Sequence, residues 1–292
     1  MKSLLSPAEI SDAVVSTGIK KVKRTNLQMI LLGVMAGLFI ALGAYASNMA
    51  VHTMPADNYG MIKFLQGAVF PVGLILVLVA GADLFTGNTL IFLGVLEKKV
   101  TLKEMLNNWL LVYLGNLIGS IIFAVLIYYS GLFSTSGGAL GAFHVKIAAA
   151  KVSLPMNQLL VRAILANFAV CLAVWMAIGS KTMVGKVFAS WFPIMAFVAG
   201  GFEHSIANMY YILTGMLAKS NFASLSNVSA AKLTNLNMGG FLYNLLFSTA
   251  GNIIGGGVFI ASIYWFIFKS KTRPVEAQKP QNKEQAQSVS SA

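Results

Sequence analysis

The stretches FPVGLILVLVAGADLFTGN at residues 70–88 and FPIMAFVAGGFEHSIAN at residues 192–208 decide the fold. In both, Phe-Pro precedes Val-Ala-Gly, an acid follows the glycine, and an asparagine lies five residues after the acid. Glycine and proline interrupt helices, and broken apolar segments at matching places in two halves of a chain point to a site at the membrane midplane. The two stretches therefore predict two broken helices in an internal repeat.

A second pair of motifs extends the repeat. Residues 114–119 read LGNLIG, and residues 250–255 read AGNIIG. Two units of three helices must cross the membrane in opposite directions, so the repeat is expected to be inverted about an axis in the membrane plane. The alternative is chance similarity between apolar, glycine-rich segments.

The composition identifies the bilayer as the solvent. The chain is 57% hydrophobic and 10% charged, whereas a soluble domain carries roughly 25% charged residues. Crossing the hydrocarbon core takes ~20 helical residues. We therefore predict an all-α membrane protein with six transmembrane helices. The apolar stretches that form them run over residues 28–51, 61–96, 105–131, 157–180, 187–218 and 238–268.

The basic residues predict the orientation. The net charge of +12 would indicate a nucleic-acid partner in a soluble protein, but here lysines and arginines flank the apolar stretches. Fifteen lie on one face of the predicted bundle and five on the other, with Arg162 inside the fourth stretch. The excess of positive charge on the cytoplasmic side predicts that both termini are cytoplasmic, in a multi-pass protein of the inner cell membrane.

Three regions follow from this pattern. Residues 1–27 begin with a capping box at Ser6-Pro7-Ala8-Glu9 and continue as an amphipathic helix, expected at the cytoplasmic interface. This helix could be a pH-sensitive lid on the pore or a plain anchor. Residues 28–269 are expected to form the six-helix transmembrane domain, and the polar tail at 270–292 is expected to be disordered.

Ionisable side chains inside apolar spans are costly and are functional candidates. Asp83 and Glu203 occupy matching positions, where a carboxylate could accept hydrogen bonds from freed backbone amides. His204 has no counterpart in the first half, which favours a role in the pore, with a buried histidine satisfied by Glu203 or Asn208 as the alternative. For Arg162, snorkelling or a subunit contact is expected.

Other chemistry finds little support in the sequence. Cys171 is the single cysteine, so no disulfide within the chain and no thiolate metal cluster is possible. His52 and His144 have no partner at metal-ligand spacing. Nucleotide-binding, HExxH and GxSxG motifs are absent, and too few ionisable residues remain for an acid-base pair. We expect no metal, no cofactor, no nucleic-acid partner and no enzyme activity.

Several motifs closely resemble those of the formate/nitrite transporter family, and most of all its formate channels. They are GADLFT at residues 81–86, GFEHSIANM at 201–209, NW at 108–109, YLGN at 113–116, AN at 166–167 and GNIIGG at 251–256. The resemblance covers about residues 5–270 and implies a homopentamer of aquaporin-like six-helix protomers, each with its own pore.

The resemblance also implies roles for individual residues. His204 matches the central pore histidine, Thr86 and Asn167 lie near it, and Lys151 matches a lysine of the outer vestibule. The matches to the apolar constriction are Phe70, Leu74, Leu84, Phe85 and Phe197, and those to the supporting polar network are Glu203, Asn208 and Asn252, with Asp83 at the equivalent repeat position.

The expected function is passage of a small monovalent weak-acid anion. Apolar rings make a bare ion expensive to pass, and an anion that takes a proton from or near His204 can cross as the neutral acid. Formate is the first choice, with nitrite, hydrosulfide, acetate and lactate as alternatives. An aquaporin-like neutral-solute channel is the rival class, although neither Asn88 nor Asn208 is followed by Pro-Ala.

Overall fold

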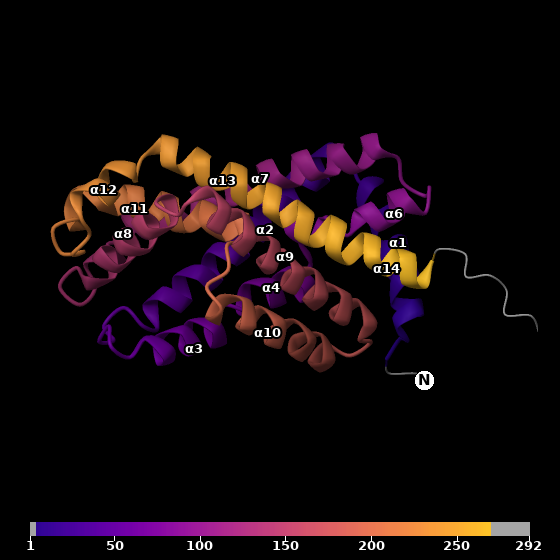
Figure 1. The fold of residues 1–292 in the computed structure, drawn as a ribbon, viewed down its shortest axis with the longest axis horizontal. Helices are drawn as coiled ribbons and strands as arrows, with labels where there is room; N and C mark the ends of the chain where they lie inside the picture. Colours follow the sequence, from indigo (N-terminus) through magenta and orange to yellow (C-terminus); the bar gives the residue numbers. More distant parts are fainter. Residues whose placement is uncertain (1–3, 270–292) are drawn as a thin grey trace, which may run out of the picture.

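The computed structural model describes residues 4–269 of the protein. The helices run mostly along one axis, and both ends of the described chain lie at the same end of the bundle (Figure 1). The predicted tail at residues 270–292 lies outside the described residues. The helices of the first half are α1 (Pro7–Val22), α2 (Asn26–Met49), α3 (Tyr59–Val69), α4 (Val72–Leu76), the π-helical η1 (Val77–Gly81), α5 (Phe85–Asn88), α6 (Ile91–Leu96) and α7 (Leu102–Tyr129).

The second half follows the same plan after a short connection, η2 (Leu132–Ser134). Its helices are α8 (Ala139–Val152), α9 (Met156–Gly179), α10 (Met183–Ala199), α11 (Ser205–Phe222), α12 (Ala230–Asn235), α13 (Met238–Ile253), the π-helical η3 (Ile254–Ser262) and α14 (Ile263–Phe268).

Side-chain caps start several of these helices. Ser6 begins α1 with a capping box: its hydroxyl accepts from the Glu9 backbone N–H, and the Glu9 carboxylate accepts from the Ser6 N–H. Thr25 and Thr101 begin α2 and α7 with the same arrangement. Each box satisfies two backbone donors that the first helical turn leaves without partners.

Five helical segments within residues 4–269 are long and apolar enough to cross a membrane. The apolar stretch predicted over 187–218 is divided between α10 and α11, which meet at a break. In the stretch predicted over 61–96, α3, α4 and η1 together form one apolar segment from Tyr59 to Gly81, and helix resumes at Phe85. Both predicted helix interruptions are therefore present.

Glycines explain the second pair of repeated motifs. Gly115 and Gly119 of α7 lie against the backbone of α2, where a Cβ atom on Gly119 would collide with the Val34 carbonyl oxygen. On the other side of the repeat, Gly251 and Gly255 lie against α9 in the same way. The close approach of these helix backbones leaves no room for a side chain, so the motifs at 114–119 and 250–255 encode helix–helix packing.

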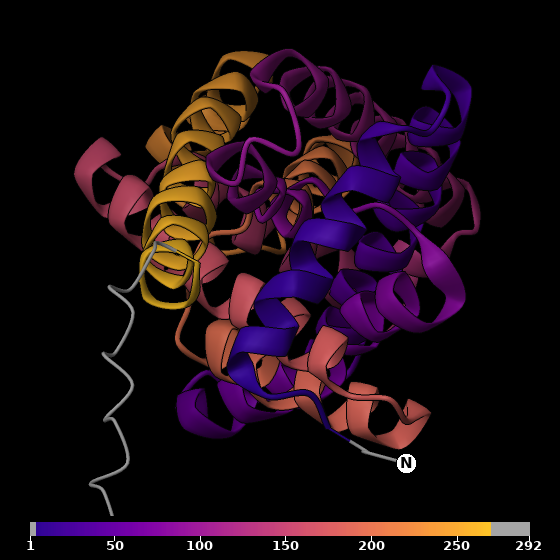
Figure 2. The same cartoon turned by 90° about the vertical axis from the view of Figure 1, so that its right-hand side faces the viewer.

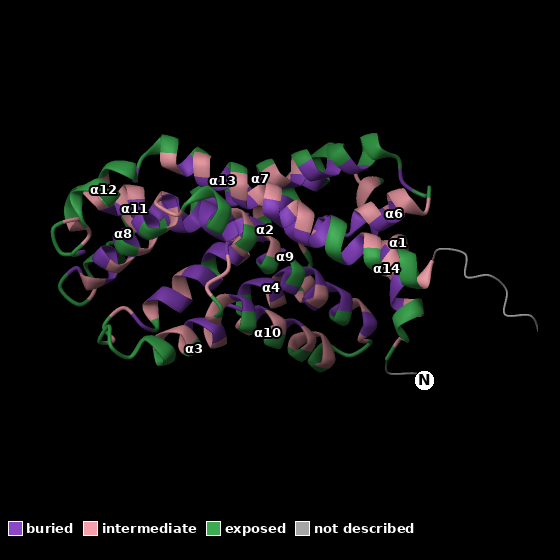
Figure 3. Ribbon diagram, in the orientation of Figure 1, coloured by how far each residue is buried: buried purple, intermediate pink, exposed green. Residues whose placement is uncertain are grey.

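Large apolar side chains cover much of the outer surface of the bundle, and small or polar ones are common inside it. Exposed leucines recur along α7 and α13, whereas the helix faces that meet in the centre are buried (Figure 3). An exposed apolar surface of this extent is that of a protein that faces lipid or other subunits. The prediction of an all-helical membrane fold is confirmed.

Viewed along the long axis, α1 lies diagonally across the end of the bundle that holds both chain ends (Figure 2). It packs on α6, α9 and α14. Its buried residues, Ile10, Ser11, Val14 and Gly18, face the bundle. The amphipathic helix therefore closes this end of the fold.

Candidate transport pathway

The two helix breaks have the same backbone geometry. Each contains a glycine with positive φ two residues before the acid, Gly81 at +91° and Gly201 at +70°. Only glycine adopts this conformation without steric cost. The chain is extended at Leu84 and at His204, and helix resumes immediately after each of them.

Two asparagines hold the breaks. The Asn116 amide oxygen accepts from the Phe85 N–H at 3.0 Å, while its NH2 group donates to the carbonyls of Gly33 and Asp83. Asn252 repeats this pattern with the Ser205 N–H at 2.9 Å and the carbonyls of two other residues, Ala163 and Glu203. The freed backbone groups are thus satisfied by amide side chains, and the expectation that carboxylates accept from them is wrong.

The carboxylates instead pair with cations. Glu203 accepts from Lys151 Nζ at 3.0 Å through both oxygens. Asp83 pairs with Lys21 Nζ at 2.9 Å and with the Arg24 guanidinium. Both acidic residues are buried: Asp83 is 0% exposed and Glu203 is 5% exposed. A buried carboxylate without a cation would be strongly destabilising, so these pairs fix α1 and α8 to the two breaks.

Asparagines close each ion pair into a ring. Glu203 also accepts from the Asn208 amide at 2.7 Å, Asn208 donates to Asn244, and Asn244 donates to the Lys151 carbonyl. At the other break the ring consists of Lys21, Asn88 and Asn108. Sequence reasoning missed Lys21, Arg24, Asn108, Asn116 and Asn244. The internal repeat could have identified Asn116, because Asn116 occupies the position that matches Asn252.

His204 lies between the two halves of the molecule. Its Nδ1 accepts from the Ala207 backbone N–H at 3.0 Å, and its Nε2 lies 2.8 Å from Thr86 Oγ1. Because an N–H donates to Nδ1, the proton of the neutral imidazole is on Nε2, which donates to Thr86. The ring is 2% exposed and lies 5.8 Å from the Phe197 ring. Its partners are therefore Thr86 and Ala207, rather than Glu203 or Asn208.

Asn167 lies behind Thr86. Its amide donates to the Thr86 carbonyl at 3.2 Å, to Thr89 Oγ1 and to the Asn252 carbonyl. Cys171 lies beside it, 3.5 Å from the same Thr86 carbonyl. The structure thus brings Asn167 close to Thr86 as a support for its backbone, with no hydrogen bond to His204 among those of the described residues.

A cavity of about 220 Å³ opens from the α3 and α8 end of the bundle and reaches His204. The Phe70 and Phe197 rings line it and meet edge to face, 5.6 Å between centroids. Lys151 and Glu203 are also in its wall. Arg162 lines the cavity too, although the sequence predicted snorkelling or a subunit contact for it.

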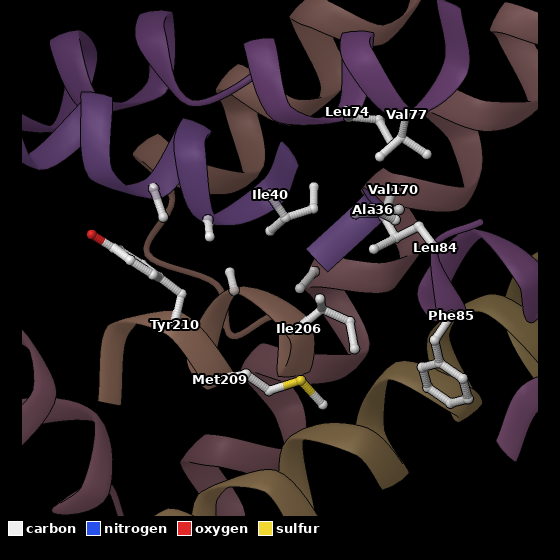
Figure 4. Close-up of a cluster of buried hydrophobic side chains, with 14 of the residues drawn as sticks. Ala36, Ile40, Leu74, Val77, Leu84, Phe85, Val170, Ile206, Met209 and Tyr210 are labelled. Carbon is white, nitrogen blue, oxygen red and sulfur yellow. The ribbon is translucent and has the colours of Figure 1, made fainter. Parts of the chain in front are cut away.

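The other apolar pathway candidates lie deeper. Leu74, Leu84 and Phe85 belong to the buried hydrophobic cluster that also holds Ile206 (Figure 4). The Phe85 ring packs edge to face against Trp109 and Tyr113 of α7. Beyond this cluster, at the α1 end, a cavity of only about 20 Å³ remains between α1 and the residues around Asn88. Within residues 4–269, no three His, Cys, Asp or Glu side chains gather as a metal site.

Apolar helices of membrane-spanning length around a polar centre, where two helices break, define a multi-pass membrane protein with a solute pathway. Comparison with known proteins makes the assignment specific. Residues 8–266 match the family model described as formate/nitrite transporter. The chain belongs to the formate/nitrite transporter family.

Individual relatives agree with this assignment. The chain is 37% identical to a probable formate transporter of Methanothermobacter thermautotrophicus, over 91% of this chain and 98% of the relative. It is 36% identical to the formate channel FocA of Escherichia coli K12, over 91% and 95% of the two chains. A solved pentameric formate channel with formate bound superposes with a TM-score of 0.73 at 34% identity, over 84% of this chain and 98% of that one.

Proposed function

We propose that this protein is a channel for small monovalent weak-acid anions, with formate as the main substrate. The observation that carries the proposal is the hydrogen bond from His204 to Thr86 at the inner end of a cavity lined by cations. The relatives described as formate channels and the solved channel with formate bound support formate over the other candidates.

The arrangement favours passage of the neutral acid. An anion beyond the Phe70 and Phe197 rings has lost most of its water, and an unpaired charge there costs several kcal/mol, even after relaxation. Protonation removes that charge. Formate, nitrite and hydrosulfide are all conjugate bases of weak acids, so the mechanism applies to each of them.

The hydrogen bonds of His204 define how it assists protonation. A neutral imidazole cannot release its Nε2 proton without becoming an imidazolate, and an imidazolium would lose the hydrogen bond from the Ala207 N–H. The proton therefore enters with the anion from the water of the cavity. The donor on Nε2 polarises the Thr86 hydroxyl, whose own proton is then directed at the passing solute.

Assembly and orientation complete the proposal. The protein is a homopentamer with one pathway in each protomer, as the solved pentameric channel supports. It lies in the inner cell membrane with both termini in the cytoplasm, as the distribution of basic residues supports. In that orientation, the cavity of about 220 Å³ is the outer vestibule.

The proposal is tested by flux measurements on the purified pentamer in proteoliposomes. Isotope-labelled formate should enter fastest, followed by nitrite, hydrosulfide, acetate and lactate, and the rate should rise as the outer pH falls toward the pKa of the acid. Glycerol swelling without formate flux would contradict the channel assignment and favour an aquaporin-like function. Nitrite flux well ahead of formate flux would contradict only the choice of substrate.

A further inference from the structure

Lys151, which matches a lysine of the outer vestibule in the family, is paired with a carboxylate. Lys151 Nζ donates to both oxygens of Glu203 at 3.0 Å and lies 5.2 Å from the centre of the Tyr211 ring. Glu203 is held in turn by the Asn208 amide. Glu203 thus compensates the charge of Lys151 and accepts from its ammonium through both oxygens, so the remaining positive charge of the outer vestibule comes from other residues.

Two more cations line the same cavity. They are Lys63 of α3 and Arg162 of α9, both partly buried. Lys63 interacts electrostatically with Arg162, Lys151 and Glu203, so its ammonium lies in the field of all three. Neither Lys63 nor Arg162 has a carboxylate within 4 Å in the described part of the chain. The Lys63 ammonium lies 5.7 Å from the centre of the Tyr59 ring.

This pair of cations carries a net positive charge that the fold does not compensate. The vestibule holds three cations and one carboxylate, Glu203, which leaves a net charge of +2 by subtraction. Holding like charges near one another in a partly buried cavity is unfavourable unless an anion joins them. The excess of positive charge in this cavity is thus suited to binding an anion.

We infer that Lys63 and Arg162 form an anion-docking site in the outer vestibule, above the Phe70 and Phe197 rings, and that Arg162 selects planar anions with two oxygens. This inference rests on the proposed function and narrows its substrate class. A guanidinium presents parallel N–H donors that match a carboxylate or nitrite through two hydrogen bonds, whereas an ammonium acts as a point charge. Hydrosulfide and chloride cannot make that paired contact.

The two cations then have different duties. Lys63 raises the local concentration of any anion, and added salt weakens this attraction by screening the charge. Arg162 distinguishes formate, acetate and nitrite from spherical or single-atom anions before any of them reaches His204. Selection therefore starts in the vestibule, and the His204–Thr86 pair acts on anions that Arg162 has already chosen.

The experiment compares Arg162→Lys, Lys63→Gln and the wild-type pentamer in proteoliposomes, with initial rates of formate and hydrosulfide influx measured against concentration. Arg162→Lys keeps the positive charge and removes the two parallel N–H donors of the guanidinium. The half-saturating concentration of formate should therefore rise about tenfold, and that of hydrosulfide should not change. Lys63→Gln should weaken both anions alike and reduce the inhibition of flux by salt. Lys146→Gln, an exposed residue of α8 outside the cavity, removes the same charge and should change neither.

Competition in the wild-type protein decides the question if a variant fails to assemble by size exclusion. Acetate should then inhibit formate influx more strongly than chloride at equal concentration. Equal inhibition, or unchanged half-saturation for formate in an assembled Arg162→Lys pentamer, would overturn the role of Arg162 while leaving the channel assignment intact. Absence of any anion flux in the wild type would overturn the proposed function and this site with it.

Discussion

The two helix breaks have nearly the same scaffold but differ in the residue they present at the centre. Asn116 and Asn252 make equivalent hydrogen bonds, and each acid pairs with a lysine from the first helix of its own half. At the extended position just before helix resumes, the first break has Leu84 and the second has His204. The two breaks thus share the hydrogen bonds that hold the backbone and differ in the side chain that they present beside the pathway.

The ends of the pathway differ in a second way. On the α8 side, one lysine reaches the break, and a cavity of about 220 Å³ remains open. On the α1 side, Arg24 adds a second cation to Asp83, and the helix leaves only about 20 Å³. The amphipathic N-terminal helix therefore occupies the space that is open at the opposite end.

Replacing His204 should have the largest effect on transport. His204→Phe removes the donor to Thr86 and makes the second break as apolar as the first, so formate flux should fall at least about a hundredfold, which corresponds to ~2.7 kcal/mol of barrier. Flux assays and size exclusion of the pentamer measure this. His204→Asn serves as the control, because it keeps a polar side chain; wild-type flux and pH response in an assembled His204→Asn pentamer would remove the histidine from the mechanism.

The equivalence of the scaffolds can be tested through stability. Asn116→Leu and Asn252→Leu each remove the amide partner of one buried backbone N–H and of the carbonyl of the acid, Asp83 or Glu203. This loss should destabilise each protein by about 3 kcal/mol. The melting temperatures in detergent should fall together. Asn107→Ala, at an exposed residue of α7, is the matched control and should melt like the wild type. A large loss for only one of the two variants would contradict the equivalence.

Much of this organisation could be predicted from the sequence because it is repeated. The breaks, their acids and the Gly-Asn motifs appear twice, and the second copy turns a weak local pattern into a specific one. The sequence could not show which side chains accept from the freed backbone N–H groups, because a carboxylate and an amide can both do so. The folded structure shows that Asn116 and Asn252 are the acceptors.

The cations of the two ends could not be predicted in the same way. Lys21 and Arg24 lie about sixty residues before Asp83 in the chain, and their pairing depends on how α1 crosses the end of the bundle. Lys63 and Arg162 likewise come together only through the fold. Side chains that come together from different helices leave no regular spacing in the sequence, whereas the residues of one broken helix lie at fixed spacings that can be recognised.

A smaller effect on transport is expected at Thr86, whose hydroxyl oxygen accepts the hydrogen bond from His204 Nε2. Thr86→Val keeps the shape and removes the hydroxyl, and formate flux should fall about tenfold, the effect of one hydrogen bond in a buried site. Thr86→Ser retains the hydroxyl and should stay within a few-fold of wild type. Equal flux in the valine and serine variants would show that the hydroxyl does not contact the solute.

The smallest effect is expected at the α1 end, where the two halves differ most. Removing residues 1–24 would also remove Lys21 and Arg24 and leave the buried Asp83 carboxylate unpaired, at a penalty of about 3–5 kcal/mol.

A deletion of residues 1–19 avoids that penalty, because Lys21 and Arg24 remain. If α1 is a lid, this shorter deletion should raise formate flux a few-fold and flatten its dependence on pH, since the cavity at the α1 end would open toward the size of the one at the α8 end. Asp12→Asn, which breaks only the exposed pair with Lys269, is the mild companion variant and should change flux less, because such pairs contribute about 0–1 kcal/mol. An unchanged pH profile in a well-assembled deletion variant would identify α1 as an anchor.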